Sequence, residues 1–290
     1  MIILLTNDDG IYAPGLAALE PELRKLGDVF VVAPMHEQSG VGHAITYLTP
    51  LIVKEVFVGQ RRWGWAVEGS PADCVKIAVS EICPPRPDLI VSGINTGLNA
   101  GINVLYSGTV AAAIEGAFFR IPSIAVSLEY DDNPRFDRAA NIARQIIEQL
   151  WQRKGPETQL FNVNIPQAAL TRPAEVRVVP MDVNLYSERY EKRLDPYGRP
   201  YYWLVGTPPK PAEDGETDLS ALAQGYVTVT PLRYNMTEER ALIRLRQEGF
   251  VLREERMSDA PGPPETPGPL PGRARLGPRG RRSVASDTTG

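Results

Sequence analysis

Short, uninterrupted apolar runs of strand length most strongly constrain how this chain can fold. They occupy residues 2–6, 29–33, 88–92 and 123–128, and β-branched residues are frequent in them. Continuous rather than alternating hydrophobicity is typical of strands buried on both faces, as in a parallel sheet. Helical patterns separate the runs, at residues 14–26, from Ser70 onward, at 109–119 and at 136–153. This alternation predicts a doubly wound α/β core over about residues 1–150.

Two parts of the chain depart from that pattern. Residues 44–68 combine β-branched and aromatic runs with turn residues, which predicts antiparallel hairpins inserted in the core. After residue 155 we expect a smaller α+β region, with strands at 160–165, 175–179, 201–205 and 226–230 and helices at 217–223 and 237–256. In the first helix, Pro21 is expected to cause a kink or to delay the helix start.

Composition limits the classes of protein. Lys and Arg total 31 against 35 Asp and Glu, which excludes a uniformly basic nucleic-acid-binding surface. No apolar run reaches the length of a membrane span, and the acidic N-terminus does not resemble a signal peptide, so we expect a cytoplasmic protein. Residues 260–290 contain seven prolines, six glycines and five arginines, which predicts a disordered tail.

Three polar clusters follow the predicted strands, where ligands bind in open α/β sheets. The first contains Asp8 and Asp9, whose adjacent charges are costly unless a cation lies between them; the alternative is a solvated turn in which an Asp caps the next helix. The second contains Ser39 in the sequence Gln-Ser-Gly-Val-Gly, which as an alternative is an ordinary glycine loop.

The third cluster is rich in Asn and Gly and spans residues 92–101, after which Ser107-Gly108-Thr109 leads into an Ala-rich helix. A helix N-terminus of this kind presents N–H groups and a positive dipole end, and so predicts an anion site. The alternative is a packed surface connection.

Together, the clusters offer aspartate, hydroxyl and amide oxygens and no soft ligands. Such a set favours Mg²⁺ or Mn²⁺ over zinc. A cation beside a helix-terminus anion site favours metal-assisted phosphate chemistry. The two histidines, His36 and His43, are interpreted as surface or packing residues.

These motifs resemble those of the SurE survival-protein family of nucleotidases over residues 1–255. The resemblance is carried by the following segments: Asn7-Asp8-Asp9-Gly10, Gln38-Ser39-Gly40, residues 69–74, residues 92–101, residues 106–110, Gly215-Glu216-Thr217-Asp218 and residues 225–232.

The resemblance implies a Rossmann-like core at about 1–150 and a C-terminal oligomerisation region at about 156–255, forming homodimers or homotetramers. It implies a divalent-metal-dependent 5′-nucleotidase acting on nucleoside monophosphates, and in some members on 3′-nucleotides and short polyphosphate. By the same resemblance, one Mg²⁺ or Mn²⁺ ion per subunit is held by four side chains, those of Asp8, Asp9, Ser39 and Asn95. The phosphate contacts fall on Asn95, Ser107, Gly108 and Thr109.

The expected mechanism is attack by a metal-activated water on a phosphate held at the helix N-terminus, with Asp8 or Asp9 as the catalytic proton acceptor. Two other functions are weighed against it. One is a non-catalytic nucleotide-binding module in stress regulation. The other is a covalent phosphoaspartate phosphatase using Asp8, for which the expected Asp-x-Asp motif is absent.

Overall fold

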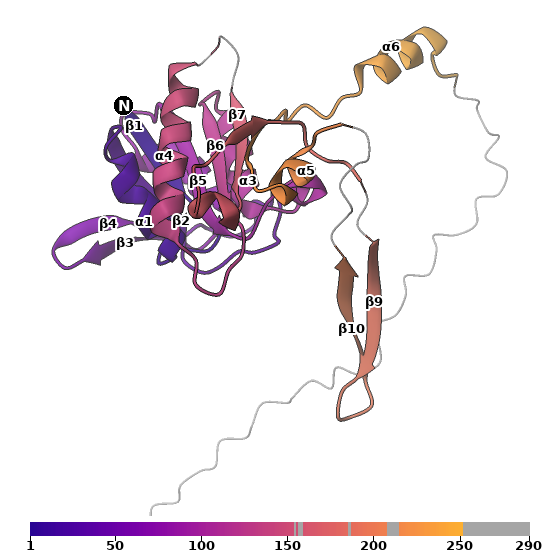
Figure 1. The fold of residues 1–290 in the computed structure, drawn as a ribbon, viewed down its shortest axis with the longest axis horizontal. Helices are drawn as coiled ribbons and strands as arrows, with labels where there is room; N and C mark the ends of the chain where they lie inside the picture. The colour runs from indigo at the N-terminus through magenta and orange to yellow at the C-terminus, as the bar shows by residue number, and fades with distance from the viewer. Residues whose placement is uncertain (154, 156–158, 185–186, 208–214, 252–290) are drawn as a thin grey trace, which may run out of the picture. The chain divides into compact units, whose positions relative to one another are not determined.

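The computed structural model describes residues 1–153, 155, 159–184, 187–207 and 215–251 (Figure 1). The chain divides into two compact units, Met1–Met236 and Thr237–Gly290. The predicted disordered tail at 260–290 lies outside the described residues.

The first unit is built on a mixed, mostly parallel sheet of nine strands within the described residues, in the order β3-β4-β2-β1-β5-β6-β7-β11-β8. The strands are β1 (Ile2–Thr6), β2 (Asp28–Pro34), β3 (Val53–Val58), β4 (Arg61–Val67), β5 (Leu89–Thr96), β6 (Ser123–Leu128), β7 (Leu160–Ile165), β8 (Val176–Val178) and β11 (Val227–Pro231). Only the pairs β3–β4 and β7–β11 are antiparallel. A separate two-stranded sheet joins β9 (Ser187–Leu194) to β10 (Pro200–Thr207). The predicted doubly wound α/β class is confirmed.

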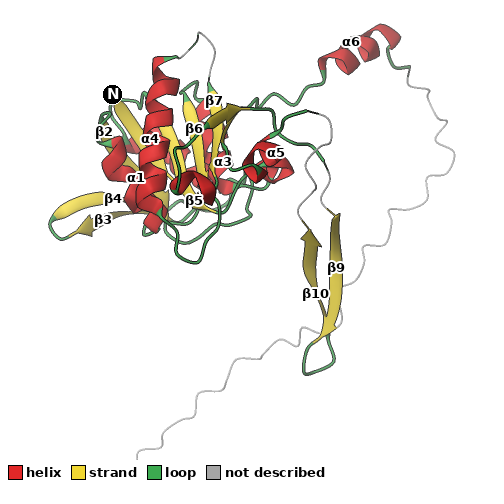
Figure 2. Cartoon of the chain, viewed as in Figure 1, coloured by secondary structure: helices red, strands yellow, loops and turns green. Residues whose placement is uncertain are grey.

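Helices cover both faces of the sheet (Figure 2). The helices of the first unit are α1 (Pro14–Leu23), α2 (Pro71–Ile77), α3 (Gly108–Phe118), α4 (Phe136–Gln152) and α5 (Asp218–Ala223). Helix α6 (Glu239–Glu248) belongs to the second unit. Helices α1 and α4 pack together on one face, and α2 and α3 pack together on the other. Ser70 begins α2 with a capping box in which its side chain and that of Asp73 satisfy each other's backbone N–H groups.

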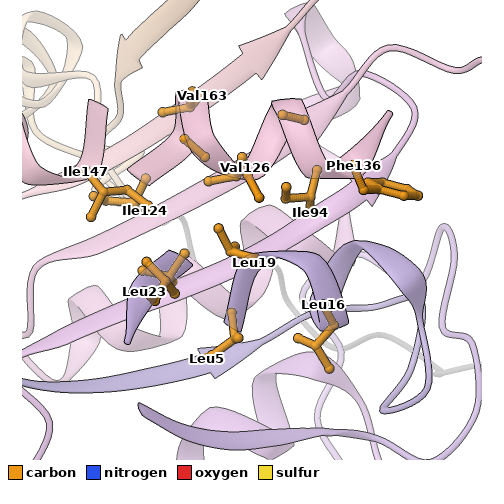
Figure 3. Close-up of a cluster of buried hydrophobic side chains, with 14 of the residues drawn as sticks. Leu5, Leu16, Leu19, Leu23, Ile94, Ile124, Val126, Phe136, Ile147 and Val163 are labelled. Atoms are coloured by element: carbon orange, nitrogen blue, oxygen red, sulfur yellow. The ribbon is translucent and has the colours of Figure 1, made fainter. Parts of the chain in front are cut away.

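Alternate residues of the central strands supply two hydrophobic layers, as the continuous apolar runs predict. Leu5 of β1 and Val126 of β6 face the α1–α4 layer (Figure 3), whereas Leu4 of β1 and Ile90 of β5 face the α2 layer. Each of these side chains is fully buried. The sheet is therefore covered on both sides, and the exposed edge at the carboxyl ends of its strands is where polar groups gather.

Several elements differ from the prediction. Within residues 44–68 only one hairpin forms, β3–β4 at the edge of the sheet, and residues 44–52 contain no strand. Helix α1 runs through Pro21 without a delayed start. Strand β5 continues to Thr96 instead of ending at residue 92, and β9 was missed because its charged residues conceal the strand pattern. Helix α6 begins at Glu239, with Glu238 rather than Thr237 as its N-cap, because the Glu238 carboxylate accepts two backbone N–H groups.

The two cysteines, Cys74 and Cys83, are free and buried. Burial raises the pKa of the Cys83 thiol to about 12 and that of Cys74 well above its ordinary value. No helix in the described part of the chain is both long and apolar enough to span a membrane.

Candidate active site

The candidate site lies at the carboxyl ends of β1 and β5, where the strand order reverses direction. Strand β2 pairs on one side of β1 and β5 on the other, which makes this the topological switch point where α/β sheets bind ligands. The turn after β1 is shaped by the buried side chain of Asn7. It accepts the N–H of Gly10 (3.2 Å) and donates to the Gly10 carbonyl (3.0 Å). Asp8 and Asp9 therefore project from a tightly held turn.

Asp8 is only 4% exposed and points at the start of α3. Its Oδ1 accepts the hydroxyl of Thr109, and its carbonyl accepts the N–H of Gln38 (2.8 Å). Burial raises the pKa of Asp8, while hydrogen bonds from the Thr109 hydroxyl and backbone N–H groups oppose the rise.

Asp9 has fewer hydrogen-bond donors. Its Oδ2 accepts one long bond, from the N–H of Thr96 (3.3 Å). Burial, followed by the charge of Asp8, raises the pKa of Asp9 to about 6. No lysine or arginine among the described residues forms an ion pair with either carboxylate. The negative charge of this turn is therefore not neutralised by a basic side chain of the described residues.

Asn95 reaches this edge because β5 is irregular. The register of β5 against β6 shifts between Ser92 and Asn95, and a side chain at Gly93 would lie 2.3 Å from the Val126 carbonyl oxygen, so only glycine fits there. The Asn95 amide donates to the Gly97 carbonyl (2.7 Å). Its donor group is thereby occupied and its side-chain oxygen remains available as a ligand.

Ser39 lies on the loop that follows β2, one residue after the backbone bond from Gln38 to Asp8. Its hydroxyl donates to Glu37 Oε1 (2.7 Å), which leaves its oxygen lone pairs available. Farther along the same loop, the N–H of Gly42 donates to the Tyr106 carbonyl (3.0 Å). The loop therefore extends from the aspartates to the start of α3.

Sequence reasoning missed Glu37 as a member of this site. Its charge raises the pKa of both Asp8 and Asp9, so it adds to the negative charge that acts on them. The sequence signal that could have identified Glu37 is its position two residues before Ser39, on the same loop.

Helix α3 begins directly against Asp8. Ser107 is its N-cap and accepts the N–H of Val110 (3.1 Å). A side chain at Gly108 would lie 2.9 Å from Asp8 Cβ, so the absence of one allows the close approach. The structure thus brings Gly108 and Thr109 against Asp8, directly after the N-cap Ser107, although the Thr109 hydroxyl already binds Asp8.

The donor set suits a hard cation. Two carboxylates, a hydroxyl and an amide oxygen are the ligand types that Mg²⁺ and Mn²⁺ accept. In the described part of the chain, no three His, Cys, Asp or Glu side chains form a metal-binding group. A metal at this edge would therefore depend on Ser39 and Asn95 as well as on the two aspartates.

The histidines lie outside this donor set. His43 contacts Glu115 (Nε2 to Oε2, 2.8 Å) and stacks on the ring of Phe118, which agrees with the packing role expected of it. His36 is exposed and borders a cavity beside the site.

The fold and the site together define an α/β protein with an acidic, oxygen-rich site at its switch point, next to a helix N-terminus. Residues 3–188 match the family model of the survival protein SurE. The chain is 56% identical to "5′-nucleotidase SurE" of Rhodopirellula baltica over 247 residues, covering 85% of this chain and 98% of that protein. It is 45% identical to the protein of the same name from Syntrophobacter fumaroxidans, covering 82% and 95%. The crystal structure of the SurE protein from Aquifex aeolicus superposes with a TM-score of 0.76 at 37% identity, covering 86% of this chain and 99% of that one.

The chain belongs to the SurE survival-protein family. The resemblance inferred from the motifs is therefore confirmed.

Proposed function

We propose that the protein is a divalent-metal-dependent 5′-nucleotidase that hydrolyses nucleoside monophosphates to nucleoside and phosphate. The observation that supports the proposal is the direct contact between Asp8 and the start of α3, because an acidic turn beside a helix N-terminus suits a cation and a phosphate together. The names of the relatives from Rhodopirellula baltica and Syntrophobacter fumaroxidans support the same activity.

In this proposal Asp8, Asp9, Ser39 and Asn95 hold one Mg²⁺ or Mn²⁺ ion. When bound, the ion polarises the phosphoryl group and activates a water molecule. The N-terminus of α3 faces the phosphate oxygens and stabilises the charge that builds up on them. Asp8 or Asp9 accepts the proton of the attacking water.

The nucleoside is proposed to occupy a cavity of about 470 Å³ beside the phosphate site. It lies beyond the carboxyl ends of β2 and β4, with Met35, His36, Ile45 and Glu68 among its lining residues. Gln38 also lines it and donates its N–H to the Asp8 carbonyl, so the cavity adjoins the aspartate turn. Its volume falls within the usual range for small-molecule sites.

The cavity can be tested apart from the chemistry. We expect Ile45→Trp, which fills the cavity, to raise KM for adenosine 5′-monophosphate about tenfold and to leave KM for p-nitrophenyl phosphate nearly unchanged. Equal effects on both substrates would place the nucleoside elsewhere.

The decisive experiment on function uses the full chain after chelation. We expect no hydrolysis of adenosine 5′-monophosphate without metal and recovery with Mn²⁺ or Mg²⁺. Adenosine 3′-monophosphate and tripolyphosphate, assayed in parallel, define the substrate range. Binding without turnover would instead indicate a nucleotide-binding module, and phosphate trapped covalently on Asp8 would indicate the phosphoaspartate mechanism.

Self-association through the C-terminal region is part of the proposal. The β9–β10 hairpin exposes Tyr190, Tyr202, Trp203 and Leu204, and an isolated two-stranded ribbon is only marginally stable in water. We expect a homodimer or homotetramer by light scattering, and Trp203→Glu to shift it toward the monomer. A parent protein that is already monomeric would contradict this. The proposed location is the cytoplasm, and no membrane or specific nucleic-acid partner is proposed.

A further inference from the structure

The motif Gly215-Glu216-Thr217-Asp218 has no part in the chemistry proposed above, yet its last residue is fully buried. Asp218 is the first residue of α5, and Thr217 caps that helix. A buried carboxylate requires hydrogen-bond donors around it. The identity of those donors indicates what this motif does.

Asp218 accepts three backbone N–H groups, two of them from distant parts of the chain. Its Oδ2 accepts the N–H of Gly101 (2.8 Å), and its Oδ1 accepts the N–H of Asp182 (2.8 Å) and of Leu219 (2.8 Å). Burial raises the pKa of Asp218, and these three N–H groups oppose the rise. Because both oxygens accept N–H groups, the geometry is suited to the ionised carboxylate.

Gly101 lies midway along the loop between two candidate site groups, Asn95 and Ser107. Its φ of +58° favours glycine, and a side chain there would lie 3.0 Å from Leu219. The backbone of the loop thus packs closely against the start of α5.

The first half of the same loop has its own buried anchor on β7. The N–H of Asn99 donates to Asn164 Oδ1 (2.8 Å), and the amides of Asn164 and Asn162 both donate to the Asn99 carbonyl. Asn99 and Gly101 are therefore fixed by different elements. Asp218 holds Gly101, where the half of the loop leading to Ser107 and α3 begins.

The partner of Asp218 connects this anchor to the β9–β10 hairpin. Asp182 is 1% exposed, and its carboxylate accepts the Thr217 hydroxyl (2.8 Å) and the N–H of Asn184 (2.8 Å). In sequence, Asp182 precedes the hairpin and Thr217 follows it. The two segments that flank the hairpin are thus joined by the Thr217–Asp182 hydrogen bond, next to Asp218, which binds Gly101.

We propose that Asp218 is a positioning residue for the loop from Asn95 to Ser107, and that through Asp182 it links the placement of this loop to the base of the β9–β10 hairpin. The inference rests on the proposed function for its kinetic consequence, because the loop connects a metal ligand to the phosphate-binding helix. Its structural consequence, a loop held by Asp218, is independent of any activity.

The test uses Asp218→Asn in the full chain. The variant keeps the side-chain volume but turns an NH₂ group toward one of the N–H donors, so at least one anchoring bond is lost. We expect amide hydrogen exchange in peptides covering residues 97–105 to rise about tenfold. We also expect kcat for p-nitrophenyl phosphate, per folded molecule, to fall about tenfold with a smaller change in KM, because displaced groups act chiefly in the transition state.

Asp88→Asn is the matched control. The Asp88 carboxylate also accepts a backbone N–H, from Ile2 (2.8 Å), but it does so at the opposite edge of the sheet. This variant should change neither loop exchange nor kcat. The proposal is overturned if Asp218→Asn leaves loop exchange at the parent level, raises exchange equally throughout β1 and β6, or loosens the loop without lowering kcat.

Asp182→Asn tests the link to the hairpin and is the second variant if Asp218→Asn does not fold. It weakens the junction of the two flanks while the backbone bond from Gly101 to Asp218 remains. We expect a change in loop exchange of about threefold. An unchanged loop in this variant overturns the link to the hairpin base. Should the parent show no phosphatase activity, the proposed function fails, while hydrogen exchange still decides whether Asp218 holds the loop.

Discussion

Two pairs of aspartates, Asp8–Asp9 and Asp182–Asp218, lie in different surroundings although burial raises a pKa in each pair. Asp218 accepts three backbone N–H groups, and Asp182 accepts a hydroxyl and an N–H. Asp9 accepts one long hydrogen bond and faces the charges of Asp8 and Glu37.

The hydrogen bonds of the two pairs therefore indicate different roles: Asp182 and Asp218 stabilise the fold, whereas Asp8 and Asp9 are suited to bind a ligand. Where N–H and hydroxyl groups of the protein bind both carboxylate oxygens, as at Asp218 and Asp182, the carboxylates join chain segments. Where donors are few and charges repel, the carboxylates favour a cation.

The largest effect is expected for Asp8→Asn. Loss of a carboxylate from the cation site should lower kcat for adenosine 5′-monophosphate about a thousandfold and abolish Mn²⁺ binding. Steady-state kinetics and calorimetry measure the two effects. The comparison fails if Asp218→Asn, and not Asp8→Asn, removes Mn²⁺ binding.

A smaller effect is expected for Thr109→Val, which removes the hydroxyl that orients Asp8 and preserves the side-chain shape. We expect kcat to fall about tenfold and Mn²⁺ affinity to weaken, as when a group that orients a metal ligand is lost. Thr171→Val, which removes a hydroxyl bonded to the Ala168 carbonyl away from the site, serves as the control. Equal activities of these two variants would show that the Asp8–Thr109 bond is only structural.

The smallest effect concerns pH. Because the pKa of Asp9 is raised from 3.8 to about 6, the folded state holds this proton more tightly than the unfolded state. The contribution of Asp9 to stability is therefore present below pH 3.8 and is lost as pH rises to about 6. In chelator, the free energy of unfolding of the parent should fall over this window relative to Asp9→Asn. Denaturant titrations at several pH values measure this slope, and identical slopes would contradict the raised pKa.

With Mn²⁺ present the trend should reverse. The cation binds the ionised carboxylate, so the stabilisation it provides should grow as pH rises through the same window. Stabilisation by Mn²⁺ that does not depend on pH would place the ion away from Asp9.

The central strands could be predicted because they are buried on both faces and therefore carry continuous apolar runs. Strands β1 and β6 fall at the predicted residues. Strand β9, by contrast, carries charged residues in a two-stranded ribbon, and no apolar run marks it. The irregularity of β5 was also invisible, because the contact of Gly93 with Val126 depends on a neighbouring strand.

In the candidate site, too, features that depend on local sequence could be predicted, and features that depend on distant contacts could not. Asp8, Asp9 and the polar cluster at residues 92–101 could be predicted to lie close together because polar residues at strand ends meet at one edge of a parallel sheet, and the family resemblance singled out Asn95 within that cluster. Asp218 lies 117 residues from Gly101 in sequence and binds its backbone N–H, so residue type and spacing carry no sign of its role. The contribution of Glu37 likewise depends on how the loop after β2 folds back to Asp8.

The burial of both cysteines has a practical consequence for labelling chemistry. Maleimides and iodoacetamides react with the thiolate, and the thiols of Cys74 and Cys83 are buried and held in the protonated form. A cysteine introduced at an exposed position, such as Tyr197 in the turn between β9 and β10, would therefore be the group modified in the native protein. A fluorophore or spin label could then report on the hairpin without replacement of either native cysteine.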